Sequence, residues 1–250
     1  VPVEAEIGRY YETPDYISHS DTHKGLMNRV YHWVRRVMLA RKARLVKHNS
    51  RLSQGSLLDI GTGTGYFPHF MQERGWHVSA IEKSPQARQF AKEHFELDVA
   101  APEALNEFAD KSFDVITLWH VMEHLEHLNE TWETLKRILK DQGILIIAVP
   151  NPTSFDAEKY KEMWGAYDVP RHLWHFSPSV MQQFGAKHDF ILCERHPMPF
   201  DAFYVSMLSE KYRRSAFPFI KGLITGTEAW IVSLAKKDRS SSMIYVFRKK

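Results

Sequence analysis

Short apolar runs alternate along most of the chain with longer stretches in which apolar residues recur at helical spacing. The short runs predict strands, and the longer stretches predict amphipathic helices. The predicted strands are Leu57–Ile60, His77–Ile81, Phe95–Val99, Phe113–Leu118, Ile144–Val149, Phe190–Arg195 and Met243–Phe247. The predicted helices are Tyr66–Arg74, Ser84–Glu93, Leu128–Leu139, Pro178–Lys187, Phe203–Tyr212 and Phe217–Ala235, with a turn at Asp141–Gly143.

The run Ile144–Val149 is apolar without interruption, which is typical of a strand buried on both faces of a parallel sheet. Strands separated by helices of this length indicate βαβ units. The pattern therefore predicts an α/β protein with a doubly wound sheet. Ligands of such sheets bind at the carboxyl ends of the strands, so candidate functional residues are expected there.

The first predicted strand ends in a glycine-rich turn with the pattern D-x-G-x-G-x-G, formed by Asp59, Gly61, Gly63 and Gly65. Glycine lets the backbone approach a ligand closely, and a following helix offers exposed N–H groups. A dinucleotide-binding fingerprint needs a third glycine where this chain has Tyr66, and the P-loop sequence Gly-Lys-Ser/Thr does not follow. Taken alone, the run also fits a tight structural turn.

Further motifs make the pattern specific. Glu82 follows the second predicted strand, where a carboxylate could hold both hydroxyl groups of a ribose. The strand Phe113–Leu118 leads to Glu123-His124-Leu125, and the sequence LKDQGILIIAVPNP covers residues 139–152. Across Leu57–Pro152 these motifs resemble the class I S-adenosylmethionine methyltransferases, and in particular the ubiquinone-pathway O-methyltransferases and their relatives (methyltransferase domain types 11, 12 and 23).

The resemblance implies a Rossmann-like, seven-stranded, mostly parallel sheet with helices on both faces. Helical stretches outside the matched region further predict N-terminal helices and a helical insert before the last strand. The resemblance also implies S-adenosylmethionine as cofactor, S-adenosylhomocysteine as product, and a ribose contact for Glu82. The implied cofactor-binding residues are Asp59, Gly61, Thr62, Gly63, Gly65, Tyr66, Glu82, Lys83, Ala101, Pro102, Trp119 and His120. The family often has Asp at the position of Ala101, so backbone groups must replace that contact with the adenine.

The segment Trp164–Ser177 is similar to the Pro-x-His-x-x-x-Phe-Ser segment of this methyltransferase branch. His175 could deprotonate a hydroxyl group, because the pKa of histidine lies near neutrality. His172 is an alternative base, and Arg171 could clamp an anion. Packing of a loop explains each of these residues equally well. The predicted substrate contacts are Tyr16, His19, His124, Trp164, Tyr167 and Arg171.

Two further motifs resemble known functional sites but differ from them in spacing or in position. Glu123, His124 and His127 suggest a metal site, but their spacing is not H-E-x-x-H and no further ligand is evident, so we predict no metal. A hydrogen-bond network at a helix start is the preferred interpretation. Asn151 lies between two prolines, as in the motif of amino-group methyltransferases, but that motif follows the fourth strand and Asn151 follows the fifth. We therefore do not infer methylation of an amide or base nitrogen.

Charge is unevenly placed, although the formal net charge is only +3. The stretch Arg29–Arg51 is rich in Lys and Arg, contains no acid and predicts a basic amphipathic helix. We interpret it as the solvated face of a lobe that covers the active site, with an anionic substrate, membrane surface or RNA as alternative contacts. Lys221 and Glu228 interrupt the apolar stretch Phe217–Ala235, so no membrane span is predicted; a lid, a dimer face and a membrane-surface patch stay open.

We predict a helical substrate lobe at residues 1–53 and a Rossmann-like S-adenosylmethionine-binding domain at 54–250, with its helical insert at about 201–238. The predicted activity is transfer of a methyl group to an oxygen of a small or medium-sized metabolite. The alternatives are an RNA- or lipid-surface-directed methyltransferase and a binding protein without turnover. The single cysteine excludes an intramolecular disulfide, and a polar start without a signal peptide predicts the cytoplasm. A nucleic-acid partner is not expected, and either a monomer or a homodimer fits.

Overall fold

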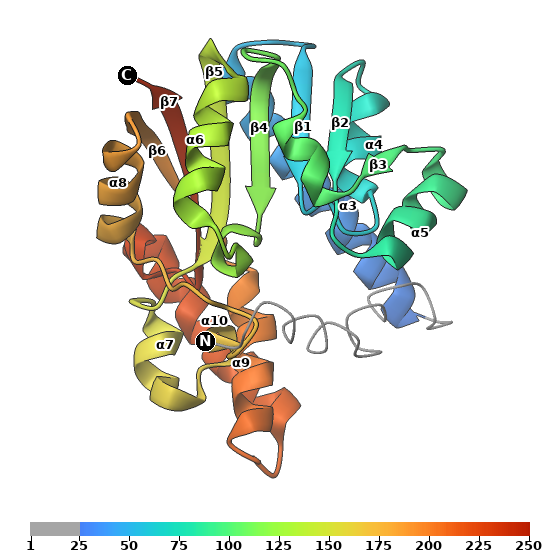
Figure 1. Cartoon of the computed structure of the whole chain (residues 1–250). Coiled ribbons are helices and arrows are strands. Elements are labelled where there is room, and N and C mark those ends of the chain that lie inside the picture. Colours follow the sequence, from blue (N-terminus) through green and yellow to red (C-terminus); the bar gives the residue numbers. More distant parts are fainter. Residues whose placement is uncertain (1–25) are drawn as a thin grey trace. The chain divides into compact units, whose positions relative to one another are not determined.

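The structure, a computed structural model, describes the backbone of residues 26–250 and the side chains of residues 32–250. Within that range, seven strands form one sheet in the order β3-β2-β1-β4-β5-β7-β6 (Figure 1). The strands are β1 (Ser56–Ile60), β2 (His77–Ile81), β3 (Val99–Ala100), β4 (Phe113–Trp119), β5 (Leu139–Pro150), β6 (Phe190–Pro197) and β7 (Ser242–Lys249). β1 pairs in parallel with β2 and β4, and β6 pairs antiparallel with β7, so the predicted mostly parallel sheet is confirmed.

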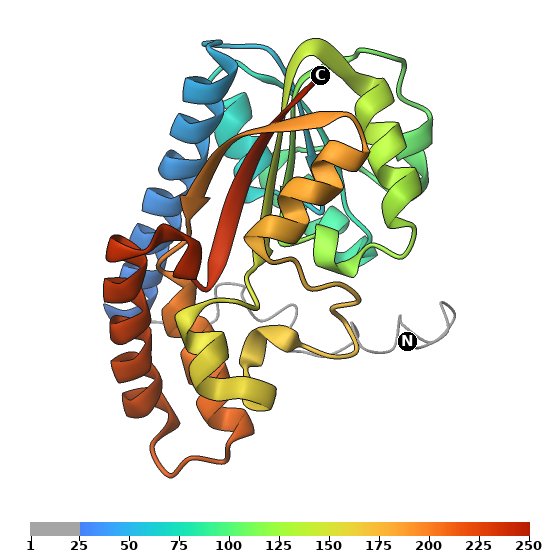
Figure 2. The same ribbon diagram turned by 90° about the vertical axis from the view of Figure 1, so that its left-hand side faces the viewer.

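Helices connect the strands (Figure 2). They are α3 (Leu26–Ser50), α4 (Tyr66–Gln72), α5 (Pro85–Phe95), α6 (Leu128–Ile138), α7 (Phe155–Tyr160), α8 (Pro178–Lys187), α9 (Asp201–Tyr212) and α10 (Pro218–Ala235). Serine side chains cap three of them by accepting a backbone N–H: Ser84 at α5, Ser154 at α7 and Ser177 at α8. The pair α9 and α10 lies between β6 and β7 in the sequence, as predicted for the helical insert.

Two predicted elements are wrong at their boundaries. Phe95 is the last residue of α5 and does not begin a strand, because the chain leaves the helix at Glu96, which has a left-handed conformation with φ of 53°. The strand there is only Val99–Ala100. The predicted turn at Asp141–Gly143 lies within β5, which begins at Leu139. Asp141 stays in the extended chain and pairs with Lys111, whose Nζ lies 2.7 Å from Oδ2.

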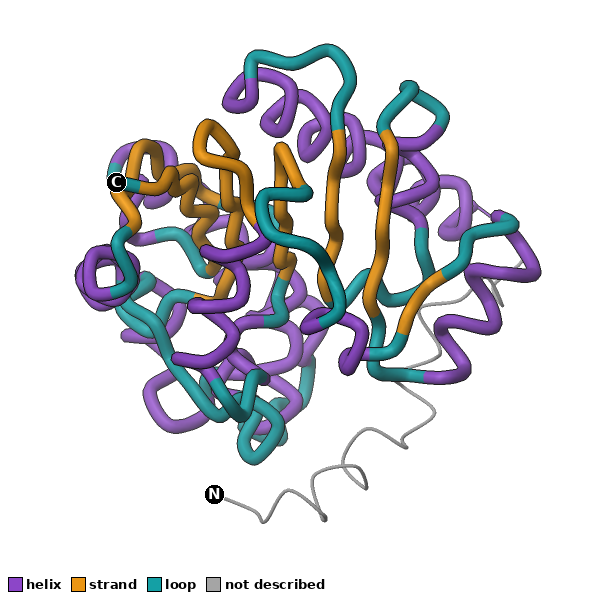
Figure 3. The backbone as a smooth tube through the Cα atoms, turned by 45° about the horizontal axis from the view of Figure 1, so that its top comes forward, coloured by secondary structure: helices purple, strands orange, loops and turns teal. Residues whose placement is uncertain are grey.

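The centre of the sheet is fully buried, as its apolar sequence predicts. Residues Ile144–Val149 of β5 have no exposed surface, and Val115, Ile116 and Leu118 of β4 have none either. Figure 3 shows the strands in a row with helices beside them. Burial on both faces leaves the strand ends as the places where polar residues can lie together.

One carboxylate fixes the strands at the end of the sheet opposite to the candidate site. Asp114 Oδ2 accepts hydrogen bonds from Ser56 N at 2.8 Å, Ser56 Oγ at 2.7 Å and Lys140 Nζ at 2.8 Å. Burial opposes ionisation of Asp114, but these bonds outweigh it and hold its pKa below the ordinary value. The network joins β1, β4 and β5 near their first residues.

The chain forms two compact units. One holds the described residues up to Leu118 together with Trp132–Leu145, and the other holds Trp119–Thr131 and Ile146–Lys250. The glycine-rich turn belongs to the first unit, and the histidine-rich segments belong to the second. The predicted division into residues 1–53 and 54–250 stays a prediction.

Candidate functional site

The glycine-rich turn between β1 and α4 is fastened to the end of β2. The backbone N–H groups of Gly61 and Thr62 donate to the Ile81 carbonyl oxygen at 2.8 and 3.0 Å. Gly61, Gly63 and Gly65 have φ values of 68°, 57° and 86°, a region that glycine adopts without strain. The backbone conformation therefore explains why three glycines stand in this turn.

Gly63 and Gly65 serve different purposes. A Cβ atom at Gly65 would lie 2.9 Å from the Ala91 Cβ and 3.2 Å from the Leu97 Cδ2, so this glycine lets α5 pack closely. Among the described residues other than its two chain neighbours, none has an atom within 4 Å of a Cβ placed at Gly63. The space beside Gly63 can therefore take a ligand that lies directly on the backbone.

Glu82 lies at the end of β2 and contacts the same turn. Its side chain is 4% exposed, its Oε2 accepts the Gly63 N–H at 2.7 Å, and its Oε1 accepts the Ser84 N–H at 2.9 Å. An ionised carboxylate has about four lone-pair directions, so both oxygens can accept further hydrogen bonds. The backbone thus positions an acceptor pair suited to two neighbouring hydroxyl groups.

Asp59 is buried at the end of β1. Its Oδ1 accepts a hydrogen bond from the Thr117 hydroxyl of β4 at 2.5 Å. Burial raises the pKa of Asp59 to about 6, although the Thr117 bond and the charge of Lys42 act in the opposite direction. This carboxyl group therefore changes its charge just below neutral pH.

The other predicted cofactor residues of this unit differ in their contacts and exposure. Tyr66 begins α4, and the Arg35 guanidinium lies 4.0 Å from the centroid of its ring, so the ring already packs against protein. Lys83 is exposed, while Ala101 and Pro102 are half-buried at the start of a short 3₁₀ helix (Pro102–Asn106). Backbone groups at these last two residues stay predicted contacts.

In the second unit, His120 follows Trp119, the last residue of β4. Its φ of 58° is uncommon for a residue other than glycine, and its N–H donates to the Ala148 carbonyl at 2.9 Å. Its ring lies between two carboxylates, with Nε2 3.1 Å from Asp201 Oδ2 and Nδ1 3.5 Å from Glu123 Oε1. Burial acts to lower the pKa of His120, but the two carboxylates raise it to about 10.

Sequence reasoning missed Asp201. It is the first residue of α9, where an acid is normally explained by the helix dipole. Only the folded chain brings it to His120, a residue far away in the sequence. A positive φ at His120, held by the surrounding structure, is the kind of strain that concentrates at functional sites.

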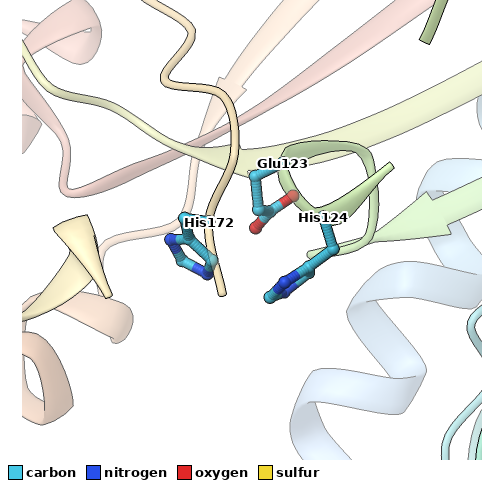
Figure 4. A group of neighbouring side chains, drawn as sticks. All are labelled: Glu123, His124 and His172. Atoms are coloured by element: carbon cyan, nitrogen blue, oxygen red, sulfur yellow. The ribbon is translucent and has the colours of Figure 1, made fainter. Parts of the chain in front are cut away.

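Glu123, His124 and His172 form a further group in the same unit (Figure 4). One donor atom from each lies within 4.8 Å of the other two. The Glu123 carboxylate is 1% exposed, and among the described residues neither of its oxygens receives a hydrogen bond within ordinary distance and angle. Burial opposes ionisation of Glu123. The positive charge of the neighbouring His120 ring outweighs this effect and holds the pKa of Glu123 below the ordinary value.

Backbone carbonyls orient both histidines of this group. The ring Nδ1 lies 2.8 Å from the Ala166 oxygen in His172 and 3.0 Å from the Arg171 oxygen in His124. A carbonyl oxygen only accepts, so each Nδ1 carries the hydrogen and the neutral ring has its lone pair on Nε2. Burial lowers the pKa of His172 to about 4, which leaves it neutral at physiological pH. His127 lies outside the group and is 3.4 Å from Glu130.

The segment 164–177 is fastened to the residues after β4. The N–H groups of Leu173 and Trp174 donate to the Glu123 carbonyl oxygen at 2.8 and 3.2 Å, and the Trp174 indole donates to Leu125 at 2.7 Å. His175 is exposed, and its Nε2 donates to the Tyr167 carbonyl at 3.1 Å. The backbone of this segment thus holds His172 beside Glu123 and leaves His175 at the surface.

The remaining predicted substrate contacts differ in accessibility. The Arg171 guanidinium pairs with Asp168, the shorter distance being 2.6 Å, and the Tyr167 ring stands edge-on to Trp164. Trp164 is 1% exposed and donates its indole N–H to Asp156 at 2.7 Å, so the site that we propose does not include it. Tyr16 and His19 lie outside the described residues.

A family model of the methyltransferase domain matches residues 30–193, more than half of the chain. The chain belongs to the methyltransferase domain family. Together with the seven-stranded fold, this makes it a class I methyltransferase with S-adenosylmethionine as its cofactor, as the resemblance in the sequence implied.

Known methyltransferases match about half of the length of this chain. An uncharacterized methyltransferase of Staphylococcus carnosus is 33% identical over 112 residues, 44% of this chain and 53% of the relative. The mitochondrial ubiquinone biosynthesis O-methyltransferase of Schizosaccharomyces pombe is 27% identical over 134 residues, 50% and 49% of the two chains. This methyltransferase chain thus spans about half the length of the curated relatives it matches.

A solved structure is similar in fold over most of this chain. The S-adenosylmethionine-dependent methyltransferase of Archaeoglobus fulgidus matches with a TM-score of 0.56 at 18% identity, covering 86% of this chain and 94% of the other. At this identity the likeness establishes the fold alone. The chemistry on the acceptor side depends on the particular residues of this methyltransferase and not on its fold.

Proposed function

We propose that this methyltransferase transfers a methyl group to a hydroxyl oxygen of a small or medium-sized metabolite. The observation that carries the proposal is His172, a partly buried neutral histidine with its lone pair on Nε2, held beside the Glu123 carboxylate. A base of this kind serves a hydroxyl acceptor, which must lose its proton as the ether bond forms. The ubiquinone biosynthesis O-methyltransferase among the relatives points to the same atom type.

On the cofactor side, we propose that the backbone at Gly61 and Gly63 contacts the methionine portion and that Glu82 accepts the ribose hydroxyls. The open space beside Gly63 and the available lone pairs of Glu82 support this fit. Asp59 would offer its carboxylate to the ammonium group of the methionine portion. S-adenosylmethionine supplies a methyl group that its sulfonium already activates and leaves as S-adenosylhomocysteine.

On the acceptor side, we propose that His172 takes the hydroxyl proton on Nε2 as the new carbon–oxygen bond forms. Glu123 would compensate the positive charge that His172 then carries, because the two side chains lie in one group. His120 is fixed by Asp201 and Glu123 and would position the residues after β4. His175 stays the alternative base, and Tyr167 and Arg171 stay predicted substrate contacts.

The affinity for S-adenosylmethionine should fall as the pH drops through about 6. Asp59 has its pKa raised to about 6, so it is ionised above this pH and neutral below it. Loss of its charge removes an attraction for the cationic ligand, and a bound cation in turn favours the ionised form. We expect Kd to rise about tenfold between about pH 7.5 and about pH 5. Calorimetric titration of the wild type and of Asp59→Asn measures this; an equal pH dependence in both would contradict the role of Asp59.

Removal of metal ions should leave the activity unchanged. Glu123, His124 and His172 are a donor set that could take an ion, but the His120 imidazolium already lies 3.5 Å from Glu123 and would repel it. We therefore keep the expectation that no metal is needed. Assays after dialysis against EDTA, with and without added Zn²⁺, check this. A loss of turnover that Zn²⁺ restores would replace the base mechanism by a metal-assisted one.

The type of acceptor atom can be determined directly. The protein is incubated with S-adenosylmethionine and matched pairs of small compounds that carry either a hydroxyl or an amino group on the same skeleton. Mass spectrometry of the products is expected to find methyl ethers. Products methylated only on nitrogen would contradict the proposal. Binding of the cofactor without any product across a broad panel would favour a binding protein without turnover.

The RNA-directed alternative depends on the basic helix α3. Arg35 and Lys42 of α3 contact aromatic rings of α4. The Arg35 guanidinium lies over the Tyr66 ring, and Lys42 Nζ lies 5.7 Å from the centroid of the Phe67 ring. Packing against α4 thus engages two of the cations, which favours the structural interpretation of this helix. Binding of RNA at low salt that is lost on reversing the charges of Arg36 and Arg41 would restore the alternative.

A further inference from the structure

The helices α9 and α10 form an antiparallel pair that packs through small residues (Figure 2). A Cβ atom at Gly222 would lie 2.6 Å from the Met207 Cα, and one at Gly226 would lie 2.8 Å from the Phe203 Cα. A side chain at either glycine would therefore collide with the backbone of α9, so the two helices approach closely. The buried residues of α10 are all small or polar: Gly222, Thr225, Gly226, Ala229 and Ser233.

The opposite face of α10 is apolar and exposed. Its large side chains are between 47% and 64% exposed: Phe219, Ile220, Leu223, Ile224, Ile231 and Leu234. A helix on the surface of a soluble protein normally turns its large apolar residues inward and its polar residues outward. α10 has the inverse arrangement, with small residues inside and large apolar residues outside, which is typical of helices that pack in lipid. We call this surface the α10 apolar face.

Cations and aromatic rings gather where the two helices meet. Between Lys211 and Thr227 the sequence contains Lys211, Arg213, Arg214 and Lys221 and no acid. All four are exposed, and the rings of Phe217 and Phe219 are each 63% exposed beside them. Basic residues attract anionic lipid headgroups, and aromatic rings favour the interface between headgroups and acyl chains.

We propose that the α10 apolar face inserts into the interface of a bilayer that contains anionic lipids. None of the helices in residues 26–250 has the length and apolar character needed to cross a bilayer, so α10 would lie along the surface. A second copy of the chain is less suited to cover the α10 apolar face, because it would place the same cations next to those of the first copy. The single acid of α10, Glu228, is already paired with Lys159 and offers them no compensation.

Flotation with lipid vesicles tests this inference independently of the methyl transfer. The protein is mixed with vesicles of phosphatidylcholine, either alone or with phosphatidylglycerol, at low and at physiological salt. We expect binding to the vesicles that contain phosphatidylglycerol, weakened by salt. Failure to bind these vesicles at low salt would overturn the proposal, whatever the outcome of the methylation assays.

Matched variants locate the binding surface. The double variant Phe219→Gln and Ile224→Gln should reduce partitioning by about tenfold or more, because two inserted apolar side chains are lost. Both residues are exposed, so the fold should be kept. Ile191→Gln is the control: Ile191 is 51% exposed on β6, outside the α10 apolar face, and its variant should bind as the wild type does. Equal loss in the control would contradict the proposal.

The second-copy alternative has its own outcome. Sedimentation equilibrium of the wild type and the double variant measures association of the protein without lipid. We expect a monomer in both cases, or an association that the double variant does not change. A dimer that the double variant dissociates, together with no vesicle binding, would assign the α10 apolar face to a protein interface and overturn the lipid proposal.

Discussion

Replacing Gly63 with valine should abolish binding of S-adenosylmethionine and leave the protein folded. Apart from the two chain neighbours, no described residue has an atom within 4 Å of a Cβ at this position, so the new side chain would occupy the space that we assign to the cofactor. The cost to folding is backbone strain at a φ of 57°, about 1–3 kcal/mol, which is less than the stability of about 5–15 kcal/mol typical of a domain. Calorimetric titration and thermal unfolding measure the two effects separately.

Gly63→Ala separates strain from exclusion. Alanine suffers similar strain but extends by only one carbon, so its variant should unfold close to the valine variant and keep part of its affinity. Gly65→Ala should behave differently, because its Cβ would meet the Ala91 Cβ at 2.9 Å and disturb the packing of α5. Affinity in the micromolar range for Gly63→Val would refute the placement of the cofactor on this turn.

His172→Asn should lower kcat by about 10²–10⁴ and leave the affinity for S-adenosylmethionine unchanged. The asparagine amide can take the place of Nδ1 and donate to the Ala166 carbonyl, which keeps the local structure. It lacks the Nε2 lone pair, so only the proposed proton acceptor is lost. Steady-state kinetics with a hydroxyl acceptor, and the dependence of kcat on pH in both proteins, provide the measurement.

Variants of two other histidines provide the comparison for His172→Asn. His175→Asn removes the alternative base, and a larger loss there than in His172→Asn would move the role to His175. His127→Asn is the control, because His127 is exposed and lies outside the group of Glu123, His124 and His172. Activity of His172→Asn within about threefold of the wild type would exclude His172 as the base, since a general base normally contributes far more.

The cofactor half of the site could be predicted from the sequence because its residues act through local structure. The D-x-G-x-G-x-G turn, the strand before it and the acid after the next strand are neighbours in the chain, and their spacing fixes their geometry. The sequence could not tell that Gly65 is needed for packing against α5, since the contact with Ala91 depends on how α5 folds back.

The acceptor half was harder to predict because its residues come from distant segments. His172 reaches Glu123 through backbone hydrogen bonds that join the segment 164–177 to the residues after β4. Spacing in the sequence instead suggested His127 as the partner of Glu123 and His124. Asp201 was missed because an acid in the first turn of a helix has an ordinary explanation. The close contact of Gly222 and Gly226 with α9 was also not predicted, because it depends on how the two helices pair in the fold.

Calorimetric titration with S-adenosylmethionine, S-adenosylhomocysteine and NADH, side by side, tests whether the glycine turn and Glu82 bind S-adenosylmethionine. We expect binding of the first two, because they share the methionine portion and the ribose that the glycine turn and Glu82 would hold, and no binding of NADH. Binding of NADH, or of none of the three, would contradict this expectation.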